Sequence, residues 1–244
     1  MENLKEKMAR AKVKNLNDAS AERTDGHRKM FNPKTIALIG ATEKEGSVGR
    51  AIMENLQLSK NRKIFPVNPN RTTVLGFPCY PDIRSVREPI DLAVVATPAR
   101  TVPEIVEECG KAGVQGIVII SAGFREIGEE GKRLEDETRQ IRKKYGMRII
   151  GPNCVGFVRP NLGLNASFLK ARPEGGKIAF ISQSGALGSA ILDWAVNAHI
   201  GFSMFASLGS MIDIDFGDLI DFLGDDPDTR SIMIYMEGVG NAKK

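Results

Sequence analysis

Short apolar runs alternate with amphipathic stretches along most of the chain, and this alternation predicts the fold class. The first run, residues 35–40, ends at a glycine and is typical of a strand buried on both faces of a parallel sheet. Similar runs follow at 63–67, 91–96, 116–120 and 147–151, with helices expected over 46–58, 101–112 and 129–145. Strands that alternate with helices of this length indicate an α/β protein with a doubly wound parallel sheet.

A second series of alternating elements begins near residue 177. The pattern predicts strands over 177–182, 201–206 and 231–235, and helices over 185–197 and 216–223. The segment 151–175 before this series is rich in Pro, Gly and Asn, which is typical of a crossing segment between two units. Three strands make an incomplete open sheet whose last strand exposes an edge unless something covers it. We therefore expect a fragment of a longer protein, a chain that needs a partner, or one that self-associates.

The first 30 residues differ from the rest of the chain because they are polar and basic. Leu4, Met8 and Val13 are spaced like the apolar positions of a weak amphipathic helix. This segment could form a helix that docks on a partner or a partly disordered leader, and we favour the leader. The predicted organisation is an extension over 1–30, a first unit over 31–160 and a second, partial unit over 161–244.

Composition and charge narrow the class of ligand. The net charge is +4, Lys and Arg are interspersed with acidic residues, and aromatic residues make up 6% of the chain, so nothing indicates a nucleic-acid surface. The three cysteines are widely spaced and form neither a paired framework nor a Cys-x-x-Cys zinc site, so no metal is predicted. No apolar stretch of signal or membrane length occurs at the N-terminus, and we expect a cytoplasmic protein that does not enter a membrane.

The most informative motif is the glycine turn that follows the first strand, Gly40-Ala-Thr-Glu-Lys-Glu-Gly46-Ser-Val-Gly49. A glycine turn that opens a helix offers free backbone N–H groups to a phosphate. In a site for NAD, an acidic residue after the next strand would hold the ribose diol. Here that strand is followed by Asn68-Pro-Asn-Arg71, which is neutral and then basic. Because an Arg can pair with an extra ribose phosphate, the pattern indicates NADP or the 3′-phospho-ADP end of coenzyme A.

Small residues at the ends of the other strands would let a ligand approach the backbone. They are Thr97-Pro98-Ala99, Ser121-Ala122-Gly123 and Gly151-Pro-Asn153-Cys154. Ligands of open parallel sheets bind at the carboxyl ends of the strands, although strand ends of any such fold tend to be small and polar. Ser182-Gln-Ser184-Gly185 repeats the strand-to-helix turn in the second unit and predicts either an anion site or a simple helix cap.

Several kinds of catalysis are not predicted. The sequence lacks Gly-x-Ser-x-Gly, and its histidines are His27 and His199, so a serine-hydrolase triad is not expected. His199 falls at an expected helix end, where we predict a structural role. Without a nearby basic partner, Cys154 is interpreted as a small residue in a tight loop rather than a nucleophile.

Five motifs together resemble the NDP-forming acyl-CoA synthetases, a family that includes ADP-forming acetyl-CoA synthetase and the succinyl-CoA synthetase alpha subunit. The motifs are Gly40-Ala-Thr42, Val67-Asn-Pro69, Gly151-Pro-Asn-Cys-Val-Gly156, Ser182-Gln-Ser-Gly185 and Asp226-Pro-Asp-Thr229. The resemblance runs from about residue 31 to the end of the sequence. It implies a CoA-binding Rossmann-like domain followed by the first part of a flavodoxin-like domain. It also implies formation of an acyl-CoA from an acid, CoA and ATP through an acyl phosphate and a phosphohistidine, with ATP, ADP and Mg held by a separate ATP-grasp domain or beta subunit.

The resemblance also assigns roles to individual residues. The CoA phosphates and adenosine would lie on the glycine turn, with Arg71 meeting a phosphate, and the pantetheine would pass the ends of the third and fourth strands. The thiol end would lie near Asn153 and Cys154. Ser182 and Ser184 would head the helix that receives the phosphohistidine, and Glu237 would support that histidine. The CoA-binding residues implied in this way are Gly40, Thr42, Glu43, Lys44, Gly46, Ser47, Asn68, Pro69, Arg71, Thr97, Pro98, Ala99, Ser121, Ala122, Gly123, Asn153 and Cys154.

One departure from the family pattern limits the expected activity. The phosphorylated histidine of the family lies in a loop beyond the glutamate, and neither histidine of this sequence occupies that place. We therefore expect the isolated chain to bind CoA without completing the ligase cycle. Two other hypotheses stay open: a regulatory CoA-sensing or acyl-CoA-sensing module of a protein acetyltransferase, and an NADP-binding oxidoreductase domain that lacks an evident proton donor. The acid substrate and the choice between ADP and GDP are not predicted.

Overall fold

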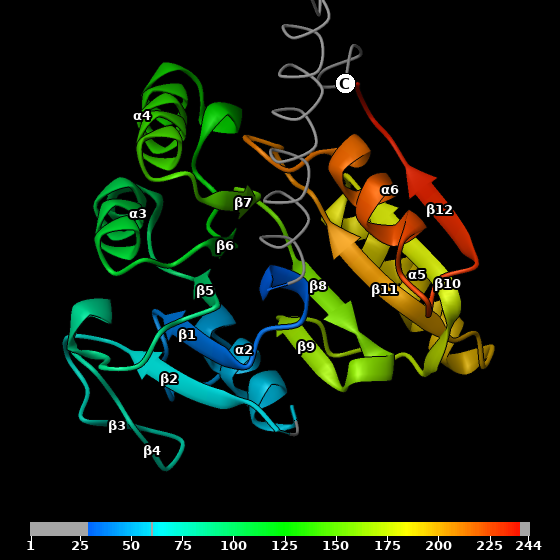
Figure 1. The fold of residues 1–244 in the computed structure, drawn as a ribbon, viewed down its shortest axis with the longest axis horizontal. Helices are drawn as coiled ribbons and strands as arrows, with labels where there is room; N and C mark the ends of the chain where they lie inside the picture. Colours follow the sequence, from blue (N-terminus) through cyan, green and yellow to red (C-terminus); the bar gives the residue numbers. More distant parts are fainter. Residues whose placement is uncertain (1–28, 60, 240–244) are drawn as a thin grey trace, which may run out of the picture.

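The computed structural model describes residues 29–59 and 61–239, and Figure 1 shows two sheets that lie side by side. The first sheet has five strands in the order β2-β1-β5-β6-β7, and every neighbouring pair is parallel. Its strands are β1 (Thr35–Ile39), β2 (Lys63–Val67), β5 (Leu92–Val95), β6 (Gly116–Ile119) and β7 (Arg148–Ile150). The predicted parallel α/β sheet is confirmed, and its carboxyl ends meet along one edge.

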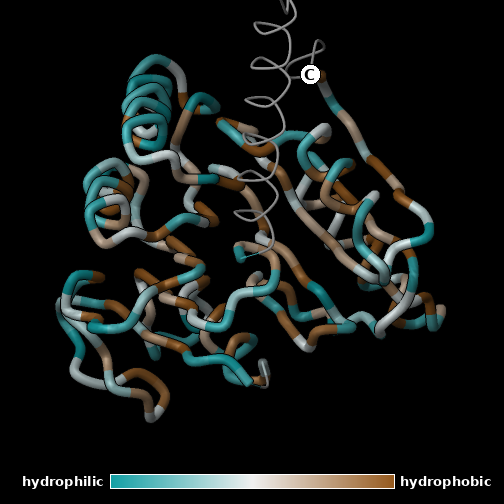
Figure 2. Tube along the Cα trace, in the orientation of Figure 1, coloured by the Kyte–Doolittle hydropathy of each residue, from teal (hydrophilic) through white to brown (hydrophobic). Residues whose placement is uncertain are grey.

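Helices cover both faces of the first sheet. They are α2 (Val48–Gln57), α3 (Val102–Lys111) and α4 (Glu129–Tyr145), and short 3-10 turns lie at Ile83–Ser85 (η1), Ala99–Thr101 (η2) and Arg125–Ile127 (η3). Alternate residues of β1 point to opposite faces, so Ile36 and Leu38 pack in the cluster that contains α2, whereas Ala37 and Ile39 pack in the cluster that contains α3. The outer helix α4 is largely hydrophilic in Figure 2, with acidic residues in its first turn and basic residues in its last.

A short hairpin missing from the predicted elements extends from the edge of the first sheet. It pairs β3 (Thr73–Val74) with β4 (Phe77–Pro78), and its two-residue turn is Leu75-Gly76. Tyr80 then returns to the sheet edge, where its N–H donates to Pro66 O at 2.9 Å. The connection from β2 to β5 therefore consists of this hairpin and the 3-10 turn η1 instead of a crossover helix.

The second sheet corrects the prediction for residues 151–175. That segment forms an antiparallel hairpin of β8 (Gly156–Arg159) and β9 (Leu164–Ser167), joined by a 3-10 turn at Pro160–Leu162 (η4). The hairpin pairs with the predicted strands to give the order β12-β10-β11-β8-β9, in which β8 is antiparallel to β11. The Pro and Gly residues that suggested a crossing segment lie in the turn and at the hairpin ends, where they do not interrupt the pairing. The domain boundary expected at 160 falls within this hairpin and stays a prediction.

The remaining elements of the second sheet match the prediction. Strands β10 (Gly175–Ser182), β11 (Phe202–Ser207) and β12 (Ser231–Tyr235) are parallel, and helices α5 (Gly185–Asn197) and α6 (Phe216–Gly224) connect them. As expected, β12 lies at the edge of the sheet. Met233, Ile234 and Tyr235 are each more than a third exposed.

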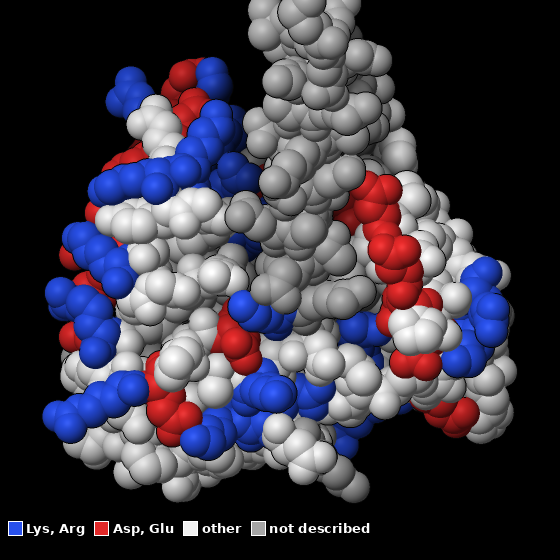
Figure 3. All heavy atoms as spheres, in the orientation of Figure 1, with Lys and Arg blue, Asp and Glu red and all other residues white. Residues whose placement is uncertain are grey.

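The two sheets share one hydrophobic core. It contains Leu38 of β1, Met53 of α2, Ala166 of β9 and Leu219 of α6, so α2 of the first unit packs against the β8–β9 edge of the second sheet. Lys and Arg side chains lie among Asp and Glu side chains on the face shown in Figure 3, without forming one continuous stripe. Among the described residues, no helix is both long enough and apolar enough to cross a membrane.

Candidate functional site

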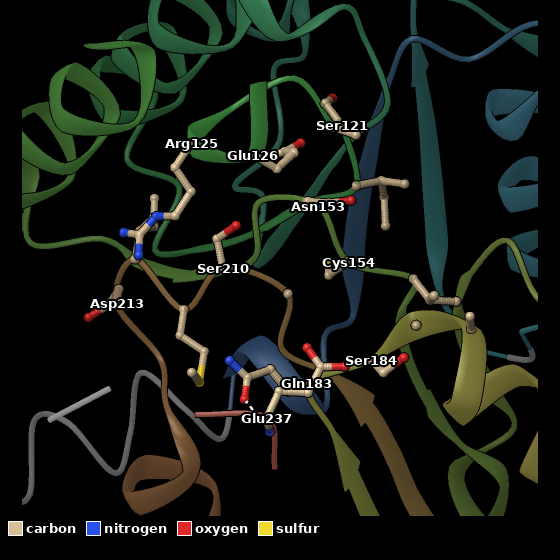
Figure 4. A pocket seen from close by; sticks show the side chains of 18 of the residues that line it. Ser121, Arg125, Glu126, Asn153, Cys154, Gln183, Ser184, Ser210, Asp213 and Glu237 are labelled. Atoms are coloured by element: carbon tan, nitrogen blue, oxygen red, sulfur yellow. Dashed lines mark hydrogen bonds between the residues drawn. The ribbon is translucent and has the colours of Figure 1, made fainter. Parts of the chain in front are cut away.

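A cleft of about 1440 Å³ lies where the carboxyl ends of the two sheets face each other (Figure 4). The first sheet contributes Thr97 and Ser121, and the loop after β7 contributes Asn153. The second sheet contributes Ser184 at the start of α5 and Glu237 just beyond β12. The structure thus brings together seven of the residues singled out in the sequence, namely Thr97, Ser121, Ala122, Asn153, Cys154, Ser184 and Glu237.

The glycine turn adjoins this cleft and is packed too tightly for larger residues. Gly40 has φ +95°, and a Cβ there would lie 2.6 Å from Ala96 O, in a residue that lines the cleft. A Cβ at Gly49 would lie 2.2 Å from Gly40 O, so the helix can start directly against the strand end. Ser47 caps α2 by accepting from Arg50 N, and Val48, the first helical residue, lines the cleft. The turn therefore lies beside the cleft, and Val48 directly after it forms part of the cleft wall.

Arg71 lies at a second, smaller pocket of about 420 Å³ beside the glycine turn. Its lining residues are Glu43, Pro69, Asn70, Arg71, Thr72 and Thr73. Asn68 sits behind it, where its amide donates to Ala41 O at 2.8 Å and its carbonyl accepts from Asn70 N at 2.9 Å. Arg71 is exposed, and no acidic side chain of the described residues pairs with its guanidinium. Three of the predicted site residues, Glu43, Pro69 and Arg71, thus line this pocket rather than the main cleft.

Ten of the predicted site residues line neither pocket: Gly40, Thr42, Lys44, Gly46, Ser47, Asn68, Pro98, Ala99, Gly123 and Ser182. Most belong to the turns that shape the pockets. Ser182 is fully buried, and its hydroxyl donates to Ser184 O at 2.7 Å, so it holds the turn before α5 from beneath. The roles of these ten residues as ligand contacts stay predictions.

Cys154 is a protonated, buried thiol. It is 4% exposed, and its Sγ donates to Ile119 O at 3.2 Å. Burial raises the pKa of this thiol to about 12. Because the thiolate is the reactive form, this geometry agrees with a small residue in a tight loop rather than a nucleophile.

Gln183 fastens the end of β12 to the start of α5. Its side-chain oxygen accepts from the backbone N–H groups of both Glu237 (2.9 Å) and Gly238 (3.0 Å). The backbone N–H of Gln183 donates to Tyr235 O at 3.0 Å. In Figure 4 Gln183, Ser184 and Glu237 lie together at one end of the cleft. The first turn of α5, capped by Ser184, therefore opens into the cleft beside the carboxylate of Glu237.

Sequence reasoning missed the charged residues at the other end of the cleft. Arg125 donates through Nε to both carboxylate oxygens of Glu135, at 2.9 and 2.8 Å, and Glu135 is 1% exposed. Asp213 accepts from Arg142, from Arg148 Nε at 2.9 Å and from Ile149 N at 2.8 Å. These residues come from a short 3-10 turn and a loop without a recognisable motif, so only the folded chain brings them together.

Backbone hydrogen bonds join the two units along the floor of the cleft. The loop after β11 donates from Ser210 N to Pro152 O (2.9 Å), from Ile212 N to Gly151 O (3.2 Å) and from Ile214 N to Ile149 O (3.0 Å). Gly209 is needed at this contact, because its φ is +57° and a Cβ would lie 2.2 Å from Pro152 O. The loop and the end of β7 therefore form one continuous support.

Histidines and metal ligands do not converge in the described part of the cleft. His199 follows α5, its side chain is 81% exposed, and Nδ1 lies 3.4 Å from the Glu174 carboxylate. His27 lies outside the described residues. Within residues 29–59 and 61–239, no group of three or more His, Cys, Asp or Glu side chains is arranged to hold a metal ion.

Comparison with known families identifies the class of protein to which this chain belongs. Residues 34–160, more than half of the chain, match the family described as "CoA binding domain", so the chain belongs to this family. Residues 175–244 match the family described as "Succinyl-CoA ligase like flavodoxin domain". The expected fold class, a Rossmann-like domain followed by a flavodoxin-like one, is confirmed.

Two curated relatives and one solved structure are similar over 88% of the chain. Acetate--CoA ligase [ADP-forming] I of Archaeoglobus fulgidus is 44% identical over 216 residues, which are 31% of that protein. The alpha subunit of acetate--CoA ligase [ADP-forming] II of Pyrococcus furiosus is 44% identical over 215 residues, 47% of its length. The structure of the Ca. Korarchaeum cryptofilum dinucleotide forming acetyl-coenzyme A synthetase 1 with phosphate and ADP is 39% identical, with a TM-score of 0.85, over 46% of that chain. The chain thus spans less than half the length of each of these proteins.

Proposed function

We propose that these residues are the CoA-binding part of an ADP-forming acyl-CoA synthetase, which joins an acid to CoA at the expense of ATP. The observation that carries this proposal is the cleft, in which the strand ends of a CoA-binding fold face the start of α5 and Glu237. A ligand bound there would have a nucleotide end at the glycine turn and a reactive end between the two sheets.

The nucleotide end of CoA would lie at the glycine turn and Arg71. Free N–H groups at the start of α2 favour a phosphate, and the Arg71 guanidinium matches the 3′-phosphate of the ribose. The turn adjoins the main cleft through Val48 and Thr97. This supports a pantetheine path past Thr97 and Ser121 towards Asn153, where the small side chains let the chain of the ligand lie close to the backbone.

The reactive end of CoA would face the start of α5. The N–H groups of its first turn and the Ser184 hydroxyl would hold a phosphoryl group, since a helix N-terminus carries partial positive charge. Glu237 would support a phosphohistidine supplied from outside the described residues, because no histidine lines the described cleft. A carboxylate favours the imidazolium form as phosphate moves on or off the ring nitrogen. ATP and Mg would be held by an ATP-grasp domain or beta subunit, in keeping with the Pyrococcus furiosus relative being an alpha subunit.

Titration calorimetry tests the binding half of this proposal. The chain is titrated with CoA, dephospho-CoA and NADPH, and we expect the tightest binding for CoA. Replacing Arg71 by Ala is expected to lower the affinity for CoA by about tenfold and to change the affinity for dephospho-CoA little. The reason is that a charge-assisted hydrogen bond contributes roughly 1.5–3 kcal/mol. Arg87→Ala is the matched control, because Arg87 is exposed and precedes β5, on the side of the sheet where the strands begin rather than at their carboxyl ends. Equal affinities of the wild-type chain for CoA and dephospho-CoA would remove the role of Arg71.

A turnover assay tests the catalytic half. The pure chain is incubated with acetate, CoA and ATP, and no thioester is expected, because no histidine lines the described cleft to carry the phosphoryl group. Measurable acetyl-CoA formation by the chain alone would overturn this part of the proposal. Tight binding of NADPH without CoA binding would instead favour the oxidoreductase hypothesis.

A further inference from the structure

The side chain of Glu43 fastens the β3–β4 hairpin to the glycine turn. Its Oε1 accepts from Leu75 N–H at 2.8 Å, across 32 residues of sequence. Gln57, the last residue of α2, donates through Nε2 to Leu75 O at 3.2 Å. The backbone N–H and C=O of Leu75 are therefore both held by side chains, one from the turn before α2 and one from the last residue of α2.

The held residue has an unfavourable backbone conformation. Leu75 has φ +47° and Gly76 has φ +83°, so two left-handed residues close the hairpin. Turns of this kind favour Asn-Gly or Gly-Gly, because a branched side chain crowds the backbone in the left-handed region. Leu75 packs against the shared core and Val74 is fully buried, so the surrounding contacts keep the hairpin in place. Such conformations persist only where neighbouring structure imposes them, and they are enriched at functional sites.

The fastened hairpin begins next to Arg71. Its base is closed by the hydrogen bond from Cys79 N to Thr72 O at 2.8 Å, one residue after Arg71. The small pocket is lined by Glu43 on one side and by residues 69–73 on the other. Glu43 is itself held from α2, since Arg50 Nη1 donates to Glu43 O at 2.7 Å. A continuous set of contacts thus runs from α2 through Glu43 to the segment that carries Arg71.

We propose that Glu43 is a positioning residue for recognition of the 3′-phosphate, a role that rests on the CoA binding proposed above. Its carboxylate holds the hairpin, and the hairpin sets the distance between Arg71 and the N–H groups of the glycine turn. One carboxylate oxygen of Glu43, Oε1, accepts from the Leu75 N–H, so this side chain has a structural partner on the hairpin. Glu43 therefore favours nucleotides with a 3′-phosphate without contacting that phosphate.

Substitutions on the same turn separate this role from general effects. Glu43→Ala removes the hydrogen bond, Glu43→Gln keeps an oxygen that can accept from Leu75 N–H, and Glu45→Ala removes an equal charge from a side chain that is 90% exposed. We expect Glu43→Ala to lower the affinity for CoA about tenfold and the affinity for dephospho-CoA by less than about twofold. Glu43→Gln is expected within about threefold of the wild type, and Glu45→Ala is expected to change neither affinity.

Hydrogen exchange at the hairpin supplies a second readout. The Leu75 amide is expected to exchange faster in Glu43→Ala and at the wild-type rate in Glu45→Ala. The proposal is overturned if Glu43→Ala leaves the ratio of CoA to dephospho-CoA affinity unchanged, or if it tightens CoA binding. If the wild-type chain binds no CoA, the proposed function fails and this role fails with it. If the wild-type chain does bind CoA but Glu43→Ala leaves the ratio of CoA to dephospho-CoA affinity unchanged, only the role of Glu43 fails. The two failures are therefore distinguishable.

Discussion

Arg159 and Asp226 form an ion pair that is almost completely removed from solvent, although 67 residues separate them in the sequence. Arg159 Nη2 lies 2.6 Å from Asp226 Oδ1, and the two side chains are 6% and 7% exposed. Arg159 ends β8, and its guanidinium also lies 5.4 Å from the centre of the Phe222 ring on α6. The pair therefore ties the β8–β9 hairpin to the connection between α6 and β12.

Removing one partner of this pair should destabilise the fold strongly. Asp226→Ala leaves the Arg159 charge buried without a carboxylate, which costs about 3–5 kcal/mol. Urea unfolding measures this loss of unfolding free energy. Asp228→Ala is the control, because Asp228 pairs with Lys177 at 3.3 Å on the surface, where such pairs contribute about 0–1 kcal/mol. Similar losses of unfolding free energy in both variants would contradict the prediction that the buried pair stabilises the fold more than the surface pair.

Gln183 should control the mobility of the segment that carries Glu237. In Gln183→Ala the N–H groups of Glu237 and Gly238 lose their shared acceptor, so their amide exchange should accelerate by roughly tenfold. Gln183→Glu keeps an acceptor oxygen and should exchange close to the wild-type rate. The exposed Gln115 before β6 gives a matched control, since Gln115→Ala should leave both amides unchanged. Unaltered exchange in Gln183→Ala would show that other contacts hold Glu237.

Glu107 should give the contact between α3 and α4 a pH dependence. Hydrogen bonds from Lys144 Nζ (2.8 Å) and Tyr145 OH (2.7 Å) hold the pKa of Glu107 at about 2, below its usual 4.5. Because the folded pKa is depressed, this contribution is complete above about pH 4.5 and is lost as the pH falls towards 2. Thermal unfolding should therefore show Glu107→Gln less stable than the wild type at pH 7, with the gap closing near pH 2. Glu104→Gln, on the exposed side of α3, should show no such convergence.

The cysteines should differ in reactivity. Burial raises the pKa of Cys109 and of Cys154 to about 12, so at pH 8 about one in ten thousand of these thiols is ionised. Cys79 is only partly buried and should react first. Iodoacetamide labelling followed by peptide mass spectrometry measures this order, and a denatured sample should lose it. Labelling of native Cys154 as fast as Cys79 would contradict its burial.

The regular elements were predictable because their patterns are local. The helices 129–145 and 185–197 were predicted with the bounds that the structure shows, since one begins after Gly128 and ends before Gly146, and the other begins after the capping residue Ser184. The β8–β9 hairpin was missed because its Pro, Gly and Asn residues suggest a loop when pairing with β11 is unknown. The β3–β4 hairpin was missed because Leu75 occupies a turn position where Asn or Gly would be expected.

The candidate site was predictable only where a strand end carries a motif. The spacing of the glycine turn and of Ser182-Gln-Ser-Gly185 predicts both as candidate anion sites, and the family resemblance implies the role of Glu237. Arg125 and Asp213 have no such signal, because their places depend on ion pairs with Glu135 on the following helix α4 and with Arg148, 65 residues earlier in the sequence. Their approach follows from tertiary packing, which no local pattern encodes.

The hydrogen bonds between residues 149–152 and 210–214 bear on how a ligand would enter. Walls that are joined at their base by backbone hydrogen bonds and share one core are held against each other without a ligand. Binding energy is then not spent on bringing the walls together, and little reorganisation precedes the first contact. For a long, flexible ligand bound in such a cleft, the main ordering cost of binding is the conformational entropy that the ligand itself loses.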